Sequence, residues 1–150
     1  MEQGFVKVAS ATPRIRVADP VYNAQVICEQ AKEAAEHGAK IVVFPELCIT
    51  GYTCNDLFLQ ELLLEKAKEA LLTIAEETGQ LETLFLVGLP VDKDGRLYNV
   101  AAVLYRGRIL GMIPKKNIPM YAEFYEGRHF TPGEETVTEY RLGKQVIPFG

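Results

Sequence analysis

The pattern of apolar and polar positions predicts two helices in the first half of the chain. Apolar residues between positions 21 and 35 recur every three or four residues, which is the spacing of one helix face. Asp19 followed by Pro20 supplies a helix start, and Gly38 supplies an end. The same spacing predicts a second helix over Leu59–Glu77. The predicted buried positions are Val21, Ala24, Ile27, Cys28, Ala31, Ala34 and Ala35 in the first helix and Leu59, Leu62, Leu63, Ala67, Ala70, Leu71 and Ile74 in the second.

Shorter apolar runs predict the strands. Phe5–Ala9 alternates apolar and polar residues, and Ile41–Phe44 is apolar at every position, which is typical of a strand in a sheet covered on both faces. Further strands are predicted at Leu84–Val87, at Asn99–Tyr105 and Ile109–Ile113 as a hairpin, and at the start of the last segment, "KQVIPFG". The turn residues of Asp92–Arg96 join antiparallel strands.

This order of elements predicts the α/β class with a mixed sheet, in a single domain over residues 1–150. The sequence shows no internal repeat and no linker-like stretch. The last predicted strand has no helix after it to cover its face. We therefore expect an incomplete domain: either the terminal strand pairs in an unusual way, or more chain follows.

Composition narrows the possible partners and the compartment. Sixteen basic and twenty acidic residues give a net charge of −4 without a basic stripe, so we expect no nucleic-acid binding. No apolar run approaches the roughly 20 residues that span a bilayer, and the start "MEQGFVKVAS" lacks the apolar core of a secretory signal. The three cysteines are odd in number and lack metal-type spacing, which favours free thiols in the cytoplasm and no metal site.

Two charged residues stand where strands end. Glu46 follows the apolar run at Ile41–Phe44, and ligands of α/β sheets gather beyond the carboxyl ends of strands. Lys115 follows Ile109–Ile113 in the proline-flanked stretch "IPKKNIPMY", where a held lysine can stabilise an oxyanion. The alternatives are that Glu46 caps the next segment or pairs with a surface lysine, and that the lysine pair is solvated.

Several other site types are excluded by their missing motifs. The sequence has no G-x-G-x-x-G after a strand, no G-x-x-x-x-G-K and no G-x-S-x-G. His37 closes the first helix, and His129 has no partner histidine at metal spacing. A zinc site and a Ser-His-Asp triad are therefore not expected.

Taken together, the segments around Glu46 and Lys115 resemble the nitrilase, or carbon–nitrogen hydrolase, superfamily. "VVFPELCITGY" is similar to the segment with that family's catalytic glutamate, and "GMIPKKNIP" to the segment with its catalytic lysine. "GYTCNDLFLQ" and "PKKNIPMYAEFYEGRHFTPG" resemble most closely the glutamine amidase domain at the N-terminus of glutamine-dependent NAD synthetases. The resemblance covers essentially the whole chain.

The resemblance implies an α-β-β-α sandwich, of which this chain would be a part, and a Glu–Lys–Cys mechanism of amide hydrolysis. Glu46 would be the catalytic base and Lys115, with an apolar Ile118 three positions on, the oxyanion lysine. Tyr52, Tyr121, Phe124 and Glu126 would bind glutamine, although the two loop aromatics could instead only pack the loop. Glu126 resembles a second family glutamate that shapes the pocket and orients the lysine.

The same resemblance places the nucleophilic cysteine after a later strand, beyond residue 150. Cys48 lies two residues from Glu46 and on an extended backbone would share its face, yet the family carries other residues there. We interpret Cys48 and Cys54 as small packed side chains near the pocket. This chain alone is expected to be inactive.

The implied whole protein is a glutamine-dependent NAD synthetase, in which the ammonia would serve ATP-dependent NAD synthesis from the deamido precursor. No cofactor is expected in this chain, since ATP and magnesium would belong to the missing C-terminal synthetase domain. A homo-oligomer is expected. The alternatives to the synthetase function are a stand-alone amidase or carbamoylase of the same superfamily and a catalytically silent module.

Overall fold

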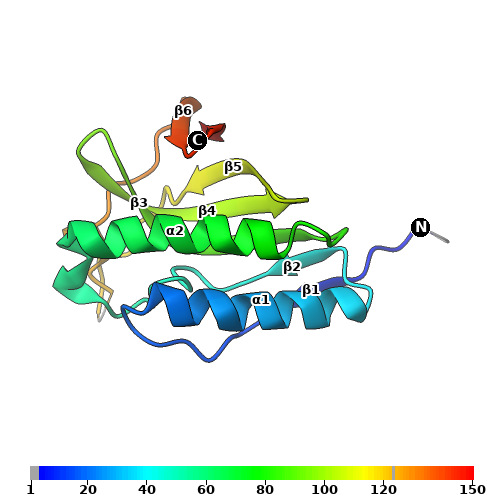
Figure 1. Ribbon diagram of the computed structural model, residues 1–150. Helices are drawn as coiled ribbons and strands as arrows, with labels where there is room; N and C mark the ends of the chain where they lie inside the picture. The colour runs from blue at the N-terminus through cyan, green and yellow to red at the C-terminus, as the bar shows by residue number, and fades with distance from the viewer. Residues whose placement is uncertain (1–3, 123) are drawn as a thin grey trace.

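The computed structural model describes residues 4–122 and 124–150. Within these residues a seven-stranded sheet has the strand order β1-β2-β3-β4-β5-β7-β6, and two helices lie side by side on one of its faces (Figure 1). The predicted α/β class with a mixed sheet is confirmed.

Strands and helices alternate in the first half, and strands dominate the second. The first half comprises β1 (Val8–Ser10), α1 (Pro20–Glu36), β2 (Ile41–Val43), the 3₁₀ helix η1 (Asn55–Leu59), α2 (Glu61–Glu77) and β3 (Leu84–Lys93). The second half comprises β4 (Arg96–Tyr105), β5 (Arg108–Pro114), the 3₁₀ helix η2 (Glu126–Arg128), β6 (Thr138–Leu142) and β7 (Gln145–Phe149). β1, β2 and β3 are parallel, β3, β4 and β5 are antiparallel, and β7 runs parallel to β5 and antiparallel to β6.

The local signals for α1 act as predicted. The Asp19 carboxylate accepts a hydrogen bond from the Tyr22 N–H at 3.1 Å, and Pro20 occupies the first turn. Gly38, with φ of +83°, follows the helix end, where a left-handed backbone conformation favours glycine. Both ends of α1 are thus set by residues adjacent to it in the sequence.

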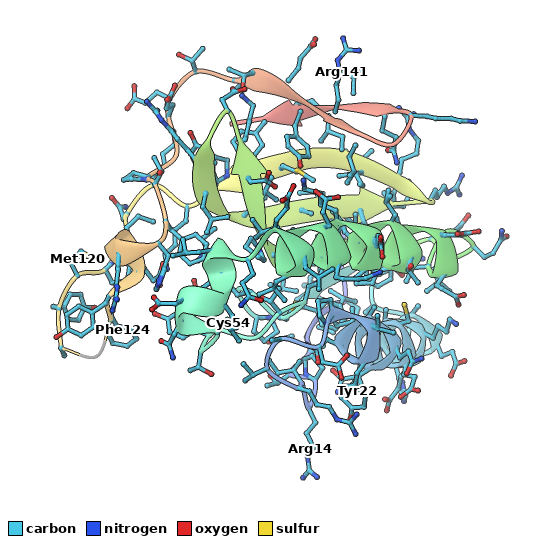
Figure 2. The ribbon with its side chains drawn as sticks, turned by 60° about the vertical axis from the view of Figure 1, so that its left-hand side comes forward. Arg14, Tyr22, Cys54, Met120, Phe124 and Arg141 are labelled. Atoms are coloured by element: carbon cyan, nitrogen blue, oxygen red, sulfur yellow. The ribbon has the colours of Figure 1, made fainter. Side chains whose placement is uncertain are left out.

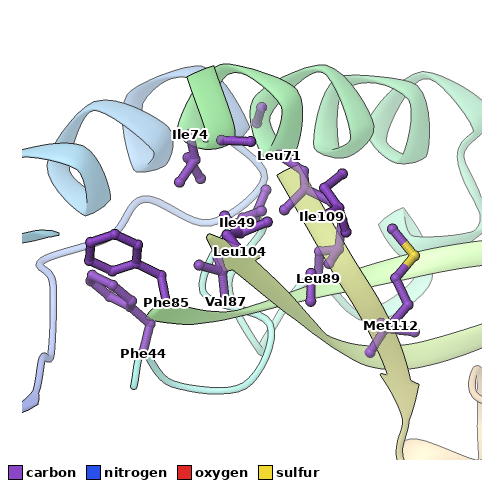
Figure 3. Packing of buried hydrophobic residues seen from close by; sticks show 14 of the residues in the cluster. Phe44, Ile49, Leu71, Ile74, Phe85, Val87, Leu89, Leu104, Ile109 and Met112 are labelled. Carbon is purple, nitrogen blue, oxygen red and sulfur yellow. The ribbon is translucent and has the colours of Figure 1, made fainter. Parts of the chain in front are cut away.

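The main core fills the space between the helices and the sheet. Figure 3 shows Leu71 and Ile74 of α2 directed towards Phe85 and Val87 of β3. Each of these four side chains is at most 1 % exposed. Cys28 is 6 % exposed and belongs to the same cluster, as the helical spacing predicts.

Three predicted core positions are wrong. Val21 is 61 %, Leu59 67 % and Leu62 69 % exposed. The residues around Leu59 form η1, so α2 begins only at Glu61 and other residues make up its buried face. Val21 lies in the first turn of α1. The buried face of α2 comprises Leu63, Leu64, Ala67, Ala70, Leu71, Ile74 and Ala75.

Strand boundaries also differ from the prediction. β1 begins at Val8, because Phe5 lies ahead of the pairing with β2 and is 82 % exposed. β3 continues six residues past Val87, since its whole length pairs with β4 up to the turn at residues 94–95. η1 and β6 (Thr138–Leu142) were not predicted. Both are short, and β6 is defined by its pairing with β7.

The sheet face opposite the helices is open among the described residues. Val43 of β2 is 45 % and Ile113 of β5 is 49 % exposed, although both lie in strands. The expectation that β2 is covered on both faces is therefore not met by the described part of the chain. This apolar open face borders the region where Glu46 and Lys115 lie.

The open face predicts self-association of the 150-residue chain, because apolar surface of this kind is removed from water by contact. Replacing Val43 with lysine is expected to shift the sedimentation coefficient towards that of the single chain. Val21→Lys is the matched control, since Val21 is also exposed but lies on the helix side. Equal sedimentation of both variants and the parent would contradict this prediction.

Candidate active site

Glu46 is held by a tight turn that passes close to β3. The Phe44 N–H donates to Leu86 O at 3.0 Å, and after the turn the Ile49 N–H donates to Gly88 O at 3.1 Å. A Cβ on Gly88 would lie 2.7 Å from Pro45 O and 2.8 Å from Glu46 C, so only glycine permits this approach. The turn therefore fixes the backbone of Glu46 against the sheet.

Lys115 is held by hydrogen bonds on both sides of its backbone. Its N–H donates to Asn99 O in β4 at 2.8 Å, and its carbonyl accepts from the Gly133 N–H at 2.9 Å. Lys115 follows Pro114, the last residue of β5. The lysine thus leaves the sheet at a fixed point beside β4.

Three charged side chains meet at this edge, and we call Glu46, Lys115 and Glu126 the charged cluster. Lys115 Nζ lies 2.9 Å from Glu46 Oε2, and 2.9 Å and 3.1 Å from the two carboxylate oxygens of Glu126. The Tyr52 hydroxyl donates to Glu126 Oε1 at 3.0 Å. The structure therefore brings together four of the six predicted site residues, from segments up to 80 positions apart in the sequence.

Exposure differs sharply within the charged cluster. The side chain of Glu126 is 5 % exposed, that of Lys115 31 % and that of Glu46 46 %. Glu126, buried and surrounded by donors, is suited to hold the lysine in place. Glu46 remains accessible and can exchange a proton with a bound molecule.

Two hollows border the charged cluster. One of about 310 Å³ on the open sheet face is lined by Glu46, Asn99 and Lys115 together with apolar side chains such as Val43 and Ile113. The second, of about 320 Å³, is lined by residues that include Tyr52, Phe58, Glu126, Arg128 and His129. A mostly apolar hollow with a few convergent polar groups is the usual form of a small-molecule site.

A third hollow, of about 420 Å³, lies between α1 and α2. It is lined by residues of these helices, including Cys28, Lys32 and Glu77, and by none of the charged cluster. Although this hollow is larger than the two beside the charged cluster, it lacks the charged cluster, so we do not assign the reaction to it.

The charge state of Lys115 follows from its neighbours. Partial burial acts against the charged form and lowers its pKa, but the hydrogen bonds from the ammonium to Glu46 and Glu126 outweigh this and raise the pKa above the ordinary value. Lys115 is consequently a cation at neutral pH. It can stabilise negative charge and is not itself a base.

Tyr52 is predicted to titrate with a pKa of about 12, because desolvation and its hydrogen bond to the Glu126 carboxylate favour the neutral phenol. The stabilisation from this raised pKa is complete below pH 10 and is lost as the pH rises through about 12. In [13Cζ]tyrosine NMR of the chain, Tyr52 should still be protonated at pH 11, and Glu126→Gln should lower its midpoint towards 10. Tyr52→Phe assigns the resonance, and a Glu126→Gln midpoint equal to the parent's would contradict the contact.

The two predicted loop aromatics lie further out. Phe124 packs edge-on against Tyr52 with ring centroids 6.5 Å apart, and Tyr121 packs against Phe124 at 5.6 Å. Tyr121 is 69 % exposed. Figure 2 shows the loop with Met120 and Phe124 projecting from the end of the molecule where η1 lies. The three rings form a row from the charged cluster to solvent.

The cysteines of this chain are placed as packed thiols. Cys48 is 2 % exposed in the main core, and burial raises the pKa of its thiol to about 12. The backbone from Glu46 to Cys48 is not extended, because Leu47 has φ of +53° and turns the chain. Cys54 is equally buried, and burial raises its pKa as well. Neither thiol has the lowered pKa of an activated nucleophile.

Sequence reasoning missed Asn99. Its side-chain amide donates to Glu46 Oε2 at 3.1 Å and to Glu126 Oε2 at 3.4 Å, and the residue is 4 % exposed. The available signal was a lone asparagine in the otherwise apolar run "NVAAVLY". A second missed pair is His129 Nε2 and Asp56 Oδ1, 3.0 Å apart beside the second hollow.

The described residues hold neither a metal-binding cluster nor a membrane-spanning helix. In the ranges 4–122 and 124–150, no group of three or more His, Cys, Asp or Glu side chains could hold a metal ion. Of the helices in the same ranges, none has the length and apolar character needed to cross a membrane.

Comparisons with known proteins agree with this geometry. The carbon–nitrogen hydrolase family matches residues 7–147. The glutamine-dependent NAD(+) synthetase of Mycobacterium tuberculosis is 38 % identical over 149 residues, which cover 99 % of this chain and 22 % of the relative. The chain thus spans about a fifth of the length of such curated relatives.

Solved structures give the same picture. The crystal structure of a glutamine-dependent NAD(+) synthetase from Cytophaga hutchinsonii superposes with a TM-score of 0.91 at 29 % identity, covering 97 % of this chain and 25 % of that one. An amidase from Nesterenkonia sp. superposes with a TM-score of 0.71 at 24 % identity, covering 95 % and 54 % of the two chains, and shows the shared fold.

Proposed function

Because the chain belongs to the carbon–nitrogen hydrolase family, we propose that it forms the acid and lysine part of a glutamine amidase site. The observation that carries this proposal is the position of Lys115 Nζ, 2.9 Å from both Glu46 and Glu126 at the edge of an apolar hollow. The 38 % identity to a protein named as a glutamine-dependent synthetase supports glutamine as the substrate.

In this proposal Glu46 accepts the proton of an attacking thiol. The thiolate forms a bond to the side-chain amide carbon of glutamine, and the carbonyl electron pair moves to oxygen, where the Lys115 ammonium stabilises it. When the tetrahedral intermediate collapses, the C–N bond breaks and Glu46 returns its proton to the departing ammonia. Water then gives a proton to Glu46 and its oxygen bonds to the thioester carbon; as this second intermediate collapses, the C–S bond breaks, glutamate leaves and Glu46 returns the proton to the thiolate.

The roles of the other residues follow from their contacts. Glu126 holds Lys115 through both of its carboxylate oxygens, and Tyr52 holds Glu126. Tyr52, Phe124 and Tyr121 line the approach and bind the amino-acid part of glutamine. We assign the nucleophile to a cysteine beyond residue 150, since the thiols of this chain are buried with raised pKa values.

The rest of the protein is proposed from the same relatives. A C-terminal synthetase domain, with ATP and magnesium, would use the ammonia to amidate a deamido precursor to NAD. We expect the whole protein to act in the cytoplasm and to assemble from more than one copy. Within this chain, residues 1–150 would be the N-terminal part of the amidase domain.

Trapping of the nucleophile tests the proposed function. We call these 150 residues together with the remainder of the amidase domain the extended protein. A glutamine-derived electrophile should modify one cysteine beyond residue 150, and excess glutamine should protect it, as read by peptide mass mapping. Lys115→Met should slow this labelling by about 10²-fold, because the oxyanion loses its cation, whereas the neighbouring exposed Lys116→Met should not.

Two results would overturn the assignment. Saturable labelling of Cys48 or Cys54 would place the nucleophile inside this chain. Labelling that glutamine does not slow would remove glutamine as the substrate.

A further inference from the structure

Asn99 contacts every member of the charged cluster. Its side-chain nitrogen lies 3.1 Å from Glu46 Oε2 and 3.4 Å from Glu126 Oε2, and its backbone carbonyl accepts the Lys115 N–H at 2.8 Å. The residue is 4 % exposed and lies near the start of β4, paired with Pro90 of β3. It also lines the 310 Å³ hollow.

The chemistry of this position favours an amide. Glu46 and Glu126 are like charges that share one ammonium, so a further carboxylate would repel both and a further cation would compete with Lys115. An asparagine amide supplies two N–H donors without charge, one for each carboxylate. The side-chain oxygen cannot take this place, because it would face the carboxylate oxygens without a proton between them.

The two carboxylate oxygens of Glu46 differ in their hydrogen bonds. Both hydrogen bonds that it makes with described residues, from Lys115 and from Asn99, end at Oε2. Oε1 therefore remains for exchange with a bound molecule.

We propose that Asn99 is a positioning residue that fixes Glu46 through Oε2 and so presents Oε1 as the proton-accepting atom. This inference rests on the proposed function for its catalytic consequence, but its structural part stands on the contacts alone. Asn99 also couples the three elements of the site, since it joins the turn after β2, the residue after β5 and η2.

The kinetic test compares two nearly isosteric changes in the extended protein. Asn99→Asp replaces the two donors by a carboxylate that faces Glu46, Glu126 and Lys115, with Tyr52 behind Glu126. We expect kcat for glutamine hydrolysis at pH 8 to fall by about 10²-fold, with KM within threefold. As the pH is lowered towards 5.5, the ratio of variant to parent kcat should rise at least tenfold, because the protonated acid regains one O–H donor.

Asn99→Leu is the matched control, since it also lacks the donors but cannot regain one. Its kcat ratio to the parent should be low and independent of pH. Equal, pH-independent losses for both variants would show a merely structural role and overturn the proposal.

A second measurement needs neither activity nor a change at Asn99. In the 150-residue chain labelled with [15N]asparagine, the side-chain N–H resonances of Asn99 should shift by at least 0.2 ppm in the proton dimension in both Glu46→Gln and Glu126→Gln. Exposed Glu139→Gln in β6 should leave them unchanged. Unshifted Asn99 resonances in both variants would refute the contacts, whereas an extended protein without glutaminase activity would refute the proposed function instead.

Discussion

Replacing Glu46 with glutamine in the extended protein is expected to lower kcat for glutamine hydrolysis by about 10³-fold. The glutamine side chain has the same shape and can still accept a hydrogen bond from Lys115, but it cannot take the thiol proton or return one to ammonia. Because Glu46 is 46 % exposed, its ion pair contributes little to folding, and the free energy of unfolding should change by less than about 1 kcal/mol. Steady-state ammonia release gives kcat.

The matched control for this prediction is Glu139→Gln, an identical change at an exposed position of β6. It should retain the parent rate. A Glu46→Gln enzyme within threefold of the parent would remove Glu46 from the proton transfers.

Replacing Gly88 with alanine is the second change with a large expected effect. The new Cβ would clash with Leu47 N and lie 2.7 Å from Pro45 O, and both of these are backbone atoms that cannot rotate away. The free energy of unfolding should fall by about 3 kcal/mol, the upper end for overpacking. Displacement of the turn by about 1 Å should also lower kcat of the extended protein by about 10²-fold.

Gly111→Ala in β5 controls for the general effect of alanine in a strand. Its Cβ would have Pro148 O at 3.8 Å as its nearest neighbour, which is an ordinary contact. Thermal or urea unfolding should separate the two variants clearly. Equal stabilities and equal rates would contradict the role of Gly88 in holding the turn of Glu46.

The sequence predicts those parts of the fold that depend on neighbouring residues. Asp19, Pro20 and Gly38 act within one helix, so their signals could be interpreted directly. The exposures of Leu59 and Leu62 could not, because they depend on whether η1 interrupts the helical pattern before α2. β6 owes its existence to a partner strand, which a local pattern does not contain.

The residues of the site also differ in how far the sequence predicts them. Glu46 and Lys115 are 69 positions apart, and only the resemblance to a family placed them together before the structure did. Asn99 was missed because its significance comes from Glu46, 53 positions earlier, and Glu126, 27 positions later. No periodicity or turn signal in the sequence encodes such contacts.

The most direct test of the central claim is a crystal structure of the Glu46→Gln extended protein after a brief soak with glutamine, which this change should make the protein hydrolyse about 10³-fold more slowly. We predict that the substrate amide lies in the hollow lined by residue 46, Asn99 and Lys115, with its carbonyl oxygen within about 3.2 Å of Lys115 Nζ. Glutamine bound elsewhere, with this hollow filled by other side chains or by water alone, would contradict the claim.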